Sequence, residues 1–195
     1  IFSPKDKDSF FTQYFVLATI VSGVLAFLIK PLAELYGRTH LLIAFNLIFF
    51  GVSLYVVDKY AKNIEDVFKS KGSVKTSLLV GFFQVLAIFP GVSRSGITIT
   101  AARLYGATKE DASSFSFLLS LPLIFGGALL KFLELKKSTL NFDYAFCIVG
   151  IVVSFVIGIL TIHYFLKLVK KIDFKYFMYY RLALGLLVCL LFFLH

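Results

Sequence analysis

Long runs of apolar residues, separated by short basic clusters, constrain the fold of this 195-residue chain more than any other feature. A helix needs about 20 apolar residues to cross the hydrocarbon core of a bilayer, and five runs meet or approach that length. The expected spans are residues 10–29, 41–57, 112–133, 143–166 and 174–194. With 59% hydrophobic and only 16% charged residues, the composition is not that of a soluble domain. The sequence therefore predicts an all-α integral membrane protein, a polytopic helical bundle that forms a single transmembrane domain over residues 1–195.

The segments between these runs are short and polar. Lys30 and Pro31 follow the first run and are expected to end its helix. Glu34, Arg38 and His40 would then lie in a short amphipathic connection. Residues 58–75 are the most polar part of the chain and predict a solvated loop that could include a short surface helix.

Residues 76–108 do not fit a simple span. Two apolar segments, each too short to cross the bilayer, are joined by a polar loop that Pro90 and Gly91 introduce. This pattern predicts a re-entrant hairpin. Irregular backbone at membrane depth is tolerated only where protein or a water-filled cavity satisfies its polar groups. The loop is therefore a candidate functional site.

The basic residues support this topology. The net charge of the chain, +9, could suit a nucleic-acid partner, but the basic residues lie in short clusters between spans, where they indicate membrane topology instead. If the hairpin enters and leaves on one side, twelve lysines fall on that side and five basic residues on the other; a full crossing gives ten and seven. The distribution favours the re-entrant hairpin, and we expect no nucleic-acid partner.

The loop sequence GVSRSGIT, residues 91–98, has the composition of an anion-binding site. Its spacing matches a nucleotide P-loop, but Ile97 stands where the lysine should be and no strand precedes it, so a nucleotide site is excluded. Glycines still let backbone amides converge, the following helix offers free N–H groups, and serine hydroxyls donate. Arg94 adds a fixed charge whose guanidinium can hold two phosphate oxygens.

Three other polar residues could join this site, and a purely structural hairpin is the alternative to it. In that alternative, Arg94 pairs with an acid or reaches the interface. Gln84 precedes the loop and could equally form an interhelical hydrogen bond. Arg103 could be a second phosphate contact or an interfacial residue. Arg181 lies within the last span, where a charge seldom faces lipid, so a cavity-facing role or a buried pair is expected.

Two motifs at fixed spacing are specific enough to indicate a family. They are PGxSRSGxT at residues 90–98 and FSFLLxxP at residues 115–122, with Gln84 and Leu86-Ala87 before them and Tyr180-Arg181 in the last span. Together they resemble the bacterial undecaprenyl-diphosphate phosphatase family of the bacitracin-resistance type. The expected catalytic residues are Arg94, Ser93 and Ser95, and the expected substrate-binding residues are Gly91, Gly96, Thr98, Gln84 and Arg181.

The resemblance implies a multi-pass phosphatase of the bacterial inner membrane. It would hydrolyse undecaprenyl (polyprenyl) diphosphate to the monophosphate and inorganic phosphate, which recycles the lipid carrier of cell-wall synthesis and confers bacitracin resistance. A polyprenyl-phosphate transporter or flippase that uses the same anion site is the alternative. The soluble acid-phosphatase signature SRx5HxxxD is excluded, because Thr100 and Leu104 occupy its histidine and aspartate positions. A homodimer is a further expectation.

Part of the family pattern is absent from this sequence. Family members carry an earlier hairpin with an ExxxE motif and a PVSSTGH-like motif, related to the second hairpin by an inverted repeat, and neither motif occurs here. The chain also begins with Ile1 rather than Met. We therefore expect it to be the second part of such an architecture. The ligands of a divalent cation, Mg²⁺ or Ca²⁺, would lie upstream of Ile1, and residues 1–195 alone would be nearly inactive.

Overall fold

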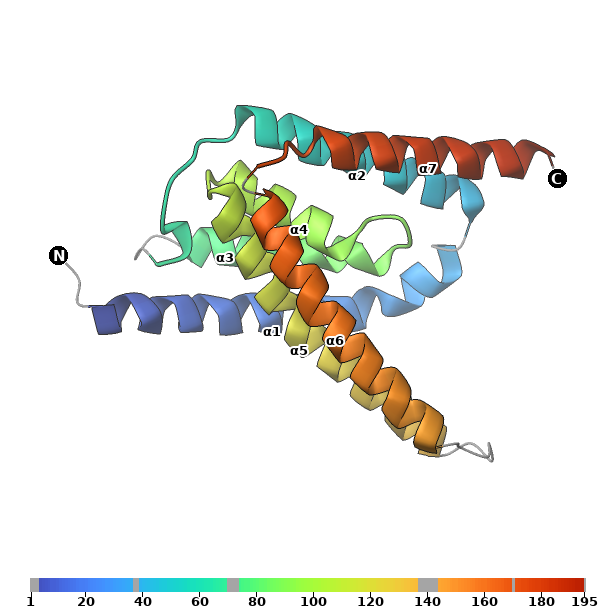
Figure 1. Cartoon of the computed structure of the whole chain (residues 1–195), viewed down its shortest axis with the longest axis horizontal. Helices are drawn as coiled ribbons and strands as arrows, with labels where there is room; N and C mark the ends of the chain where they lie inside the picture. Colours follow the sequence, from blue (N-terminus) through green and yellow to red (C-terminus); the bar gives the residue numbers. More distant parts are fainter. Residues whose placement is uncertain (1–3, 37–38, 70–73, 137–143, 170, 195) are drawn as a thin grey trace.

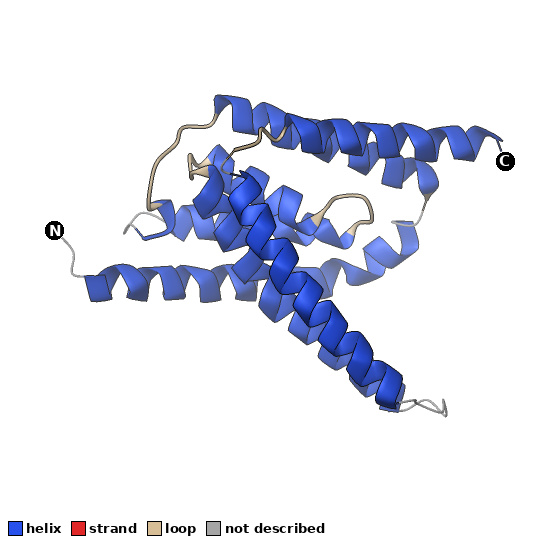
Figure 2. Ribbon diagram, viewed as in Figure 1, coloured by secondary structure: helices blue, strands red, loops and turns tan. Residues whose placement is uncertain are grey.

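A computed structural model describes residues 4–36, 39–69, 74–136, 144–169 and 171–194. Within these ranges the regular structure is helical, apart from one isolated bridge between Ile64 and Ala107 (Figure 2). The all-α prediction is confirmed. The elements are α1 (Pro4–Tyr36), α2 (His40–Tyr60), η1 (Val67–Lys69), α3 (Val74–Val85), η2 (Leu86–Ile88), α4 (Arg94–Leu104), α5 (Lys109–Lys136), α6 (Tyr144–Val169) and α7 (Lys175–Leu194).

Five of these helices are long and apolar enough to cross a membrane, and each overlaps one of the expected spans. The candidate spans are Phe11–Tyr36, His40–Tyr60, Lys109–Leu133, Ala145–Val169 and Lys175–Leu194. Figure 1 shows α5 and α6 running together away from the other helices. No residue in the apolar window of α6 is buried, so this helix is suited to contact with lipid.

The end of α1 differs from the expectation. The helix continues through Pro31 to Tyr36, so the prediction that Lys30 and Pro31 end it is wrong. Proline removes one backbone donor and crowds the preceding turn, which can bend a helix without ending it. Figure 1 shows the last turns of α1 rising toward α2. Lys30 pairs with Glu34 on the continuing helix at 3.8 Å, while Arg38 lies outside the described residues.

The hairpin enters and leaves at one end of the bundle. Ile64 precedes the hairpin and Gly106 follows its second helix, α4. The amide of Ile64 donates a hydrogen bond of 2.7 Å to the Gly106 carbonyl. The amide of Asp66 donates in the same way to the Asp111 carboxylate at 3.3 Å. The segments before and after the hairpin thus lie together, while its re-entry on one side of the membrane stays a prediction. The polar segment before the hairpin also contains the short helix η1, which sequence analysis had left open.

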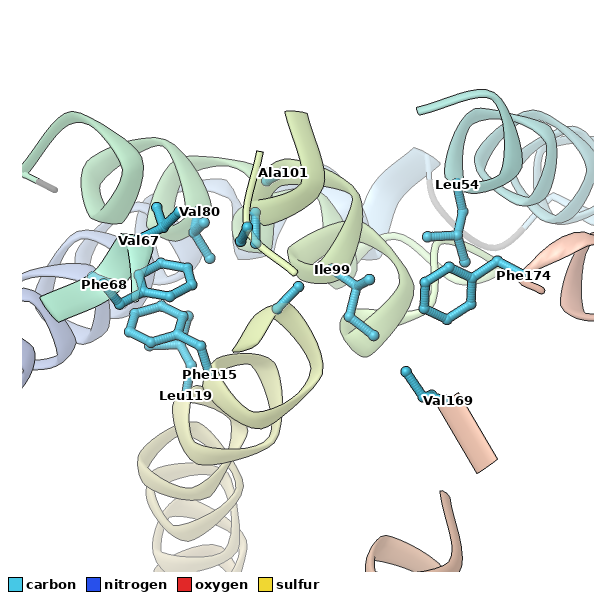
Figure 3. Packing of buried hydrophobic residues seen from close by; sticks show 14 residues of the cluster. Leu54, Val67, Phe68, Val80, Ile99, Ala101, Phe115, Leu119, Val169 and Phe174 are labelled. Carbon is cyan, nitrogen blue, oxygen red and sulfur yellow. The ribbon is translucent and has the colours of Figure 1, made fainter. Parts of the chain in front are cut away.

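A buried apolar cluster attaches the hairpin to its neighbours (Figure 3). Phe68 of η1 stacks on Phe115 of α5, with ring centroids 4.0 Å apart and ring planes 3° from parallel. Val80 of α3 and Ile99 of α4 are buried in the same cluster, and Phe174 reaches it from the start of α7. Such packing holds both half-helices against η1 and α5 and fixes the position of the loop between them.

A buried charge network lies at the base of the hairpin. Arg103 is 2% exposed, and its Nε donates to Asp58 at 2.8 Å while its Nη1 donates to Asn63 at 2.8 Å. Lys109 bridges Asp58 at 3.1 Å and Asp173 at 3.2 Å. The sequence suggested that Arg103 contacts phosphate or reaches the interface. The structure shows a third arrangement, a buried ion pair that joins α2 to α4.

Candidate functional site

The loop between η2 and α4 contains two residues in unusual backbone conformations. Gly91 has a φ of +89° and Ser93 a φ of +41°. A Cβ atom at Gly91 would lie 2.6 Å from the carbonyl oxygen of Ile43 in α2, a distance that no side chain tolerates. Position 91 therefore needs glycine both for its conformation and for its close approach to α2.

The first turn of α4 is built to present donors. Ser93 is the N-cap residue, and its Oγ accepts a hydrogen bond from the Gly96 amide at 3.2 Å. The amides of Arg94 and Ser95 come at the start of the helix, where no carbonyl of the same helix can pair with them. The positive end of the helix dipole lies at the same place. Ser93, Arg94, Ser95 and Gly96 thus lie together at the start of α4, and the predicted binding of an anion there stays a prediction.

A cavity of about 790 Å³ opens beside this terminus. Its walls come from α1, the end of the hairpin's first arm, Arg94 and α5, and they include apolar side chains such as Phe27, Leu123 and Leu130. The polar lining residues are Thr19, Ser22, Lys30, Glu34, Gln84, Arg94 and Lys131. Three basic residues against one acidic residue favour an anionic ligand, and the apolar walls suit a hydrocarbon chain.

Arg94 is exposed and lines this cavity. Its guanidinium has no ion pair or hydrogen bond to any residue that the structure describes. The structural alternative, in which Arg94 pairs with an acid, therefore finds no partner in the described ranges. The side chain is available to a ligand.

Gln84 stands out among the cavity residues because both polar atoms of its side chain are buried without a partner among the described residues. The residue is only 3% exposed. By contrast, Ser22 donates to the Ala18 and Gly81 carbonyls, and Thr19 donates to the Phe15 carbonyl. A buried amide without partners costs free energy unless a ligand or water satisfies it. Gln84 thus forms no interhelical hydrogen bond among the described residues, and its predicted contact with substrate stays a prediction.

Thr98 has its hydroxyl engaged within the protein. It bonds to the Arg94 and Ser95 carbonyls at 3.0 and 3.1 Å and to the Ser116 hydroxyl at 2.6 Å. The hydroxyl thus joins the first turn of α4 to α5. Its predicted contact with substrate stays a prediction, and Ser116 is a supporting residue for which sequence analysis assigned no role.

Arg181 approaches the loop from the side of α2 and α7 and does not line the cavity. Its Nε donates to the Leu47 carbonyl at 3.2 Å, and its Nη2 donates to the Asn46 and Gly91 carbonyls. Asn46 also donates from its side chain to the Pro90 carbonyl at 2.9 Å. Sequence analysis missed Asn46. The one signal that could have found it is an amide side chain in the middle of an otherwise apolar span.

The described residues contain no group of three or more His, Cys, Asp or Glu side chains that could hold a metal ion. Glu34 is the one carboxylate on the described cavity wall, and it pairs with Lys30. These side chains do not fit a divalent-cation site. The predicted cation and its predicted ligands upstream of Ile1 therefore stay predictions.

Comparisons with known proteins agree with the resemblance. A family model described as "Bacitracin resistance protein BacA" matches residues 2–187. An undecaprenyl-diphosphatase from Trichlorobacter lovleyi is 44% identical over 173 residues, which cover 88% of this chain and 63% of that protein. The chain thus spans less than two thirds of the length of this curated relative. The matched region includes the hairpin, Arg94 and Arg181, and the chain belongs to the bacitracin resistance protein BacA family.

Proposed function

We propose that this protein takes part in hydrolysing undecaprenyl (polyprenyl) diphosphate to the monophosphate and inorganic phosphate. One observation carries the proposal: Arg94, at the donor-rich start of α4 and without a partner among the described residues, lines a largely apolar cavity whose wall also includes Gln84. A diphosphate joined to a hydrocarbon chain matches both parts of this site. The diphosphatase from T. lovleyi supports the same activity.

The roles of the residues follow from their positions. Arg94 would neutralise charge on the phosphate oxygens, and the first amides of α4, the hydroxyls of Ser93 and Ser95 and the side chain of Gln84 would donate hydrogen bonds to them. Nη1 of Arg181 faces the first turn of α4, since a Cβ at Gly96 would lie 3.6 Å from it, and it could reach the same anion. Stabilisation of charge on these oxygens is the main requirement of phosphoryl transfer.

The bond changes of the reaction are simple. Water adds to the terminal phosphorus, the bond from that phosphorus to the bridging oxygen breaks, and the bridging oxygen leaves with the polyprenyl monophosphate. The proton lost by water passes to solvent or to the phosphate products. No described residue in the cavity is assigned as the base.

The cellular role follows from the location and the substrate. Its five candidate spans and its family make this a multi-pass bacterial membrane protein. Regeneration of the monophosphate carrier would support cell-wall synthesis and reduce sensitivity to bacitracin. We expect that the protein does not bind nucleic acid. The homodimer stays a prediction, which light scattering of the detergent-purified protein would test.

Release of inorganic phosphate tests the proposal. The full-length gene product is purified in detergent and given undecaprenyl diphosphate or farnesyl diphosphate, with Mg²⁺, with Ca²⁺ or with EDTA. We expect release that EDTA abolishes and either cation restores. Uptake of lipid phosphate into vesicles without any phosphate release would instead identify a transporter. The same assay on residues 1–195 tests the predicted upstream ligands, because a rate equal to that of the gene product would place every required carboxylate within these residues.

A further inference from the structure

The carbonyls of Pro90 and Gly91 lie where the helical ladder of the hairpin breaks, so they need donors from elsewhere. Two buried side chains supply them. Asn46 is 5% exposed and donates to the Pro90 carbonyl, and Arg181 is 9% exposed and donates to the Gly91 carbonyl. A buried carbonyl without a donor is unfavourable, and more so at membrane depth. These two contacts therefore stabilise the break in the hairpin.

The surroundings of Arg181 are unusual for a charge in a membrane span. No carboxylate in the described part of the chain lies within ion-pair distance of it, and its other hydrogen bonds go to the Leu47 and Asn46 carbonyls of α2. Gly51 provides the space, since a Cβ there would lie 3.0 Å from the Arg181 Cβ. An intramembrane arginine that contacts only carbonyls is costly, and such residues are generally functional.

The two side chains act on the same backbone segment. The main chain of Asn46 accepts a hydrogen bond from Arg181 while its side chain donates to Pro90, so α2, α7 and the loop form one connected unit. This unit ends three residues before Arg94. Any shift of Gly91 would move the first turn of α4 and with it the donors of the anion site.

We propose that Asn46 and Arg181 form a clamp that positions the loop and the start of α4. Asn46 is a positioning residue, because it acts on Arg94 through the backbone and has no place on the cavity wall. Arg181 positions the loop through Nε and Nη2, whether or not its Nη1 also contacts phosphate. The inference rests on the proposed function only for its kinetic readout.

Hydrogen exchange of residues 86–97, measured by mass spectrometry on the full-length gene product without substrate, tests the clamp directly. Asn46→Asp keeps the shape of the side chain but removes the donor to Pro90, and Arg181→Lys keeps the charge but cannot reach all three carbonyls. Both should raise the exchange rate in this segment about tenfold and leave α6 unchanged. Ser53→Ala is the matched control, because among the described residues the Ser53 hydroxyl bonds only to the Phe49 carbonyl of its own helix.

Kinetics supply the second readout. Because a displaced Arg94 loses contacts in the transition state, Asn46→Asp should lower kcat about ten- to a hundredfold and change KM less than about threefold. If the aspartate variant does not fold, Asn46→Ser, which can bond to its own helix, replaces it. Unchanged exchange in residues 86–97, or a rise in KM alone, would refute the clamp. Raised exchange in a protein without phosphatase activity would leave the clamp standing and remove the proposed function.

Discussion

Replacement of Arg94 gives the sharpest test of the anion site, because the structure separates its role in binding from any role in folding. The side chain is exposed in the cavity and has no partner among the described residues. Its removal should therefore change the free energy of unfolding by no more than about 0.5 kcal/mol. A buried structural pair would instead cost about 3–5 kcal/mol when broken.

The expected loss of activity follows from the contacts that the guanidinium can make. A hydrogen bond to a charged oxygen contributes about 1.5–3 kcal/mol, so two such bonds contribute about 3–6 kcal/mol, or roughly two to four orders of magnitude in kcat/KM. Arg94→Ala should lose that amount. Arg94→Lys keeps the charge and one contact, and should lose about one to two orders of magnitude.

The assay is phosphate release from farnesyl diphosphate, with rates normalised to the amount of monodisperse, detergent-purified full-length gene product. Circular dichroism during heating measures stability, because the described structure is helical. Near-wild-type turnover in either variant would refute the reasoning. So would an alanine variant that loses several kcal/mol of stability but keeps its activity per folded molecule.

Three further sets of substitutions test the loop and its support. Gly91→Ala should lower the free energy of unfolding by about 1–3 kcal/mol from its positive φ alone, and it should also displace the loop from α2. Thermal unfolding and turnover would show these two effects. Gly158→Ala in α6 is the control and should change neither, because a Cβ there meets nothing within 4 Å. The hydroxyl side chains are tested by Ser93→Ala, Ser95→Ala and Thr98→Ala. Each change should lower turnover about ten- to a hundredfold. Complete loss of turnover in only one variant would instead indicate a covalent nucleophile. Asp58→Asn should lower stability by about 3–5 kcal/mol, because it leaves a buried arginine charge without its carboxylate; an unchanged melting temperature would contradict that role.

The parts of the structure that sequence predicted are those with a local signal. The length of each apolar run predicts a span, and Pro90 with Gly91 between two short runs predicts the hairpin. The GVSRSGIT composition predicts a helix start with free backbone donors, and its binding of an anion stays a prediction. In each case the residues that produce the feature lie within one helix or loop, so their spacing is sufficient.

The features that sequence missed depend on distant residues. Asn46 contacts a carbonyl 44 positions away, and Arg103 pairs with a carboxylate 45 positions away, and no periodicity reports such contacts. The helix through Pro31 was missed for a related reason. Whether a proline ends a helix or bends it is decided by the packing of the turns that follow, which the local sequence does not describe.

Helix α4 runs from the buried Arg103–Asp58 pair at the base of the hairpin to the proposed anion site at its tip, so a small tilt at one end displaces the other. Its 11 residues span about 16 Å at 1.5 Å per residue. A tilt of about 4° at the Arg103–Asp58 pair would therefore move the Arg94 end by about 1 Å, a displacement that can cost an enzyme about a hundredfold in rate. Substitutions at the far end of the hairpin, with no ligand contact of their own, should act on the reaction by this route.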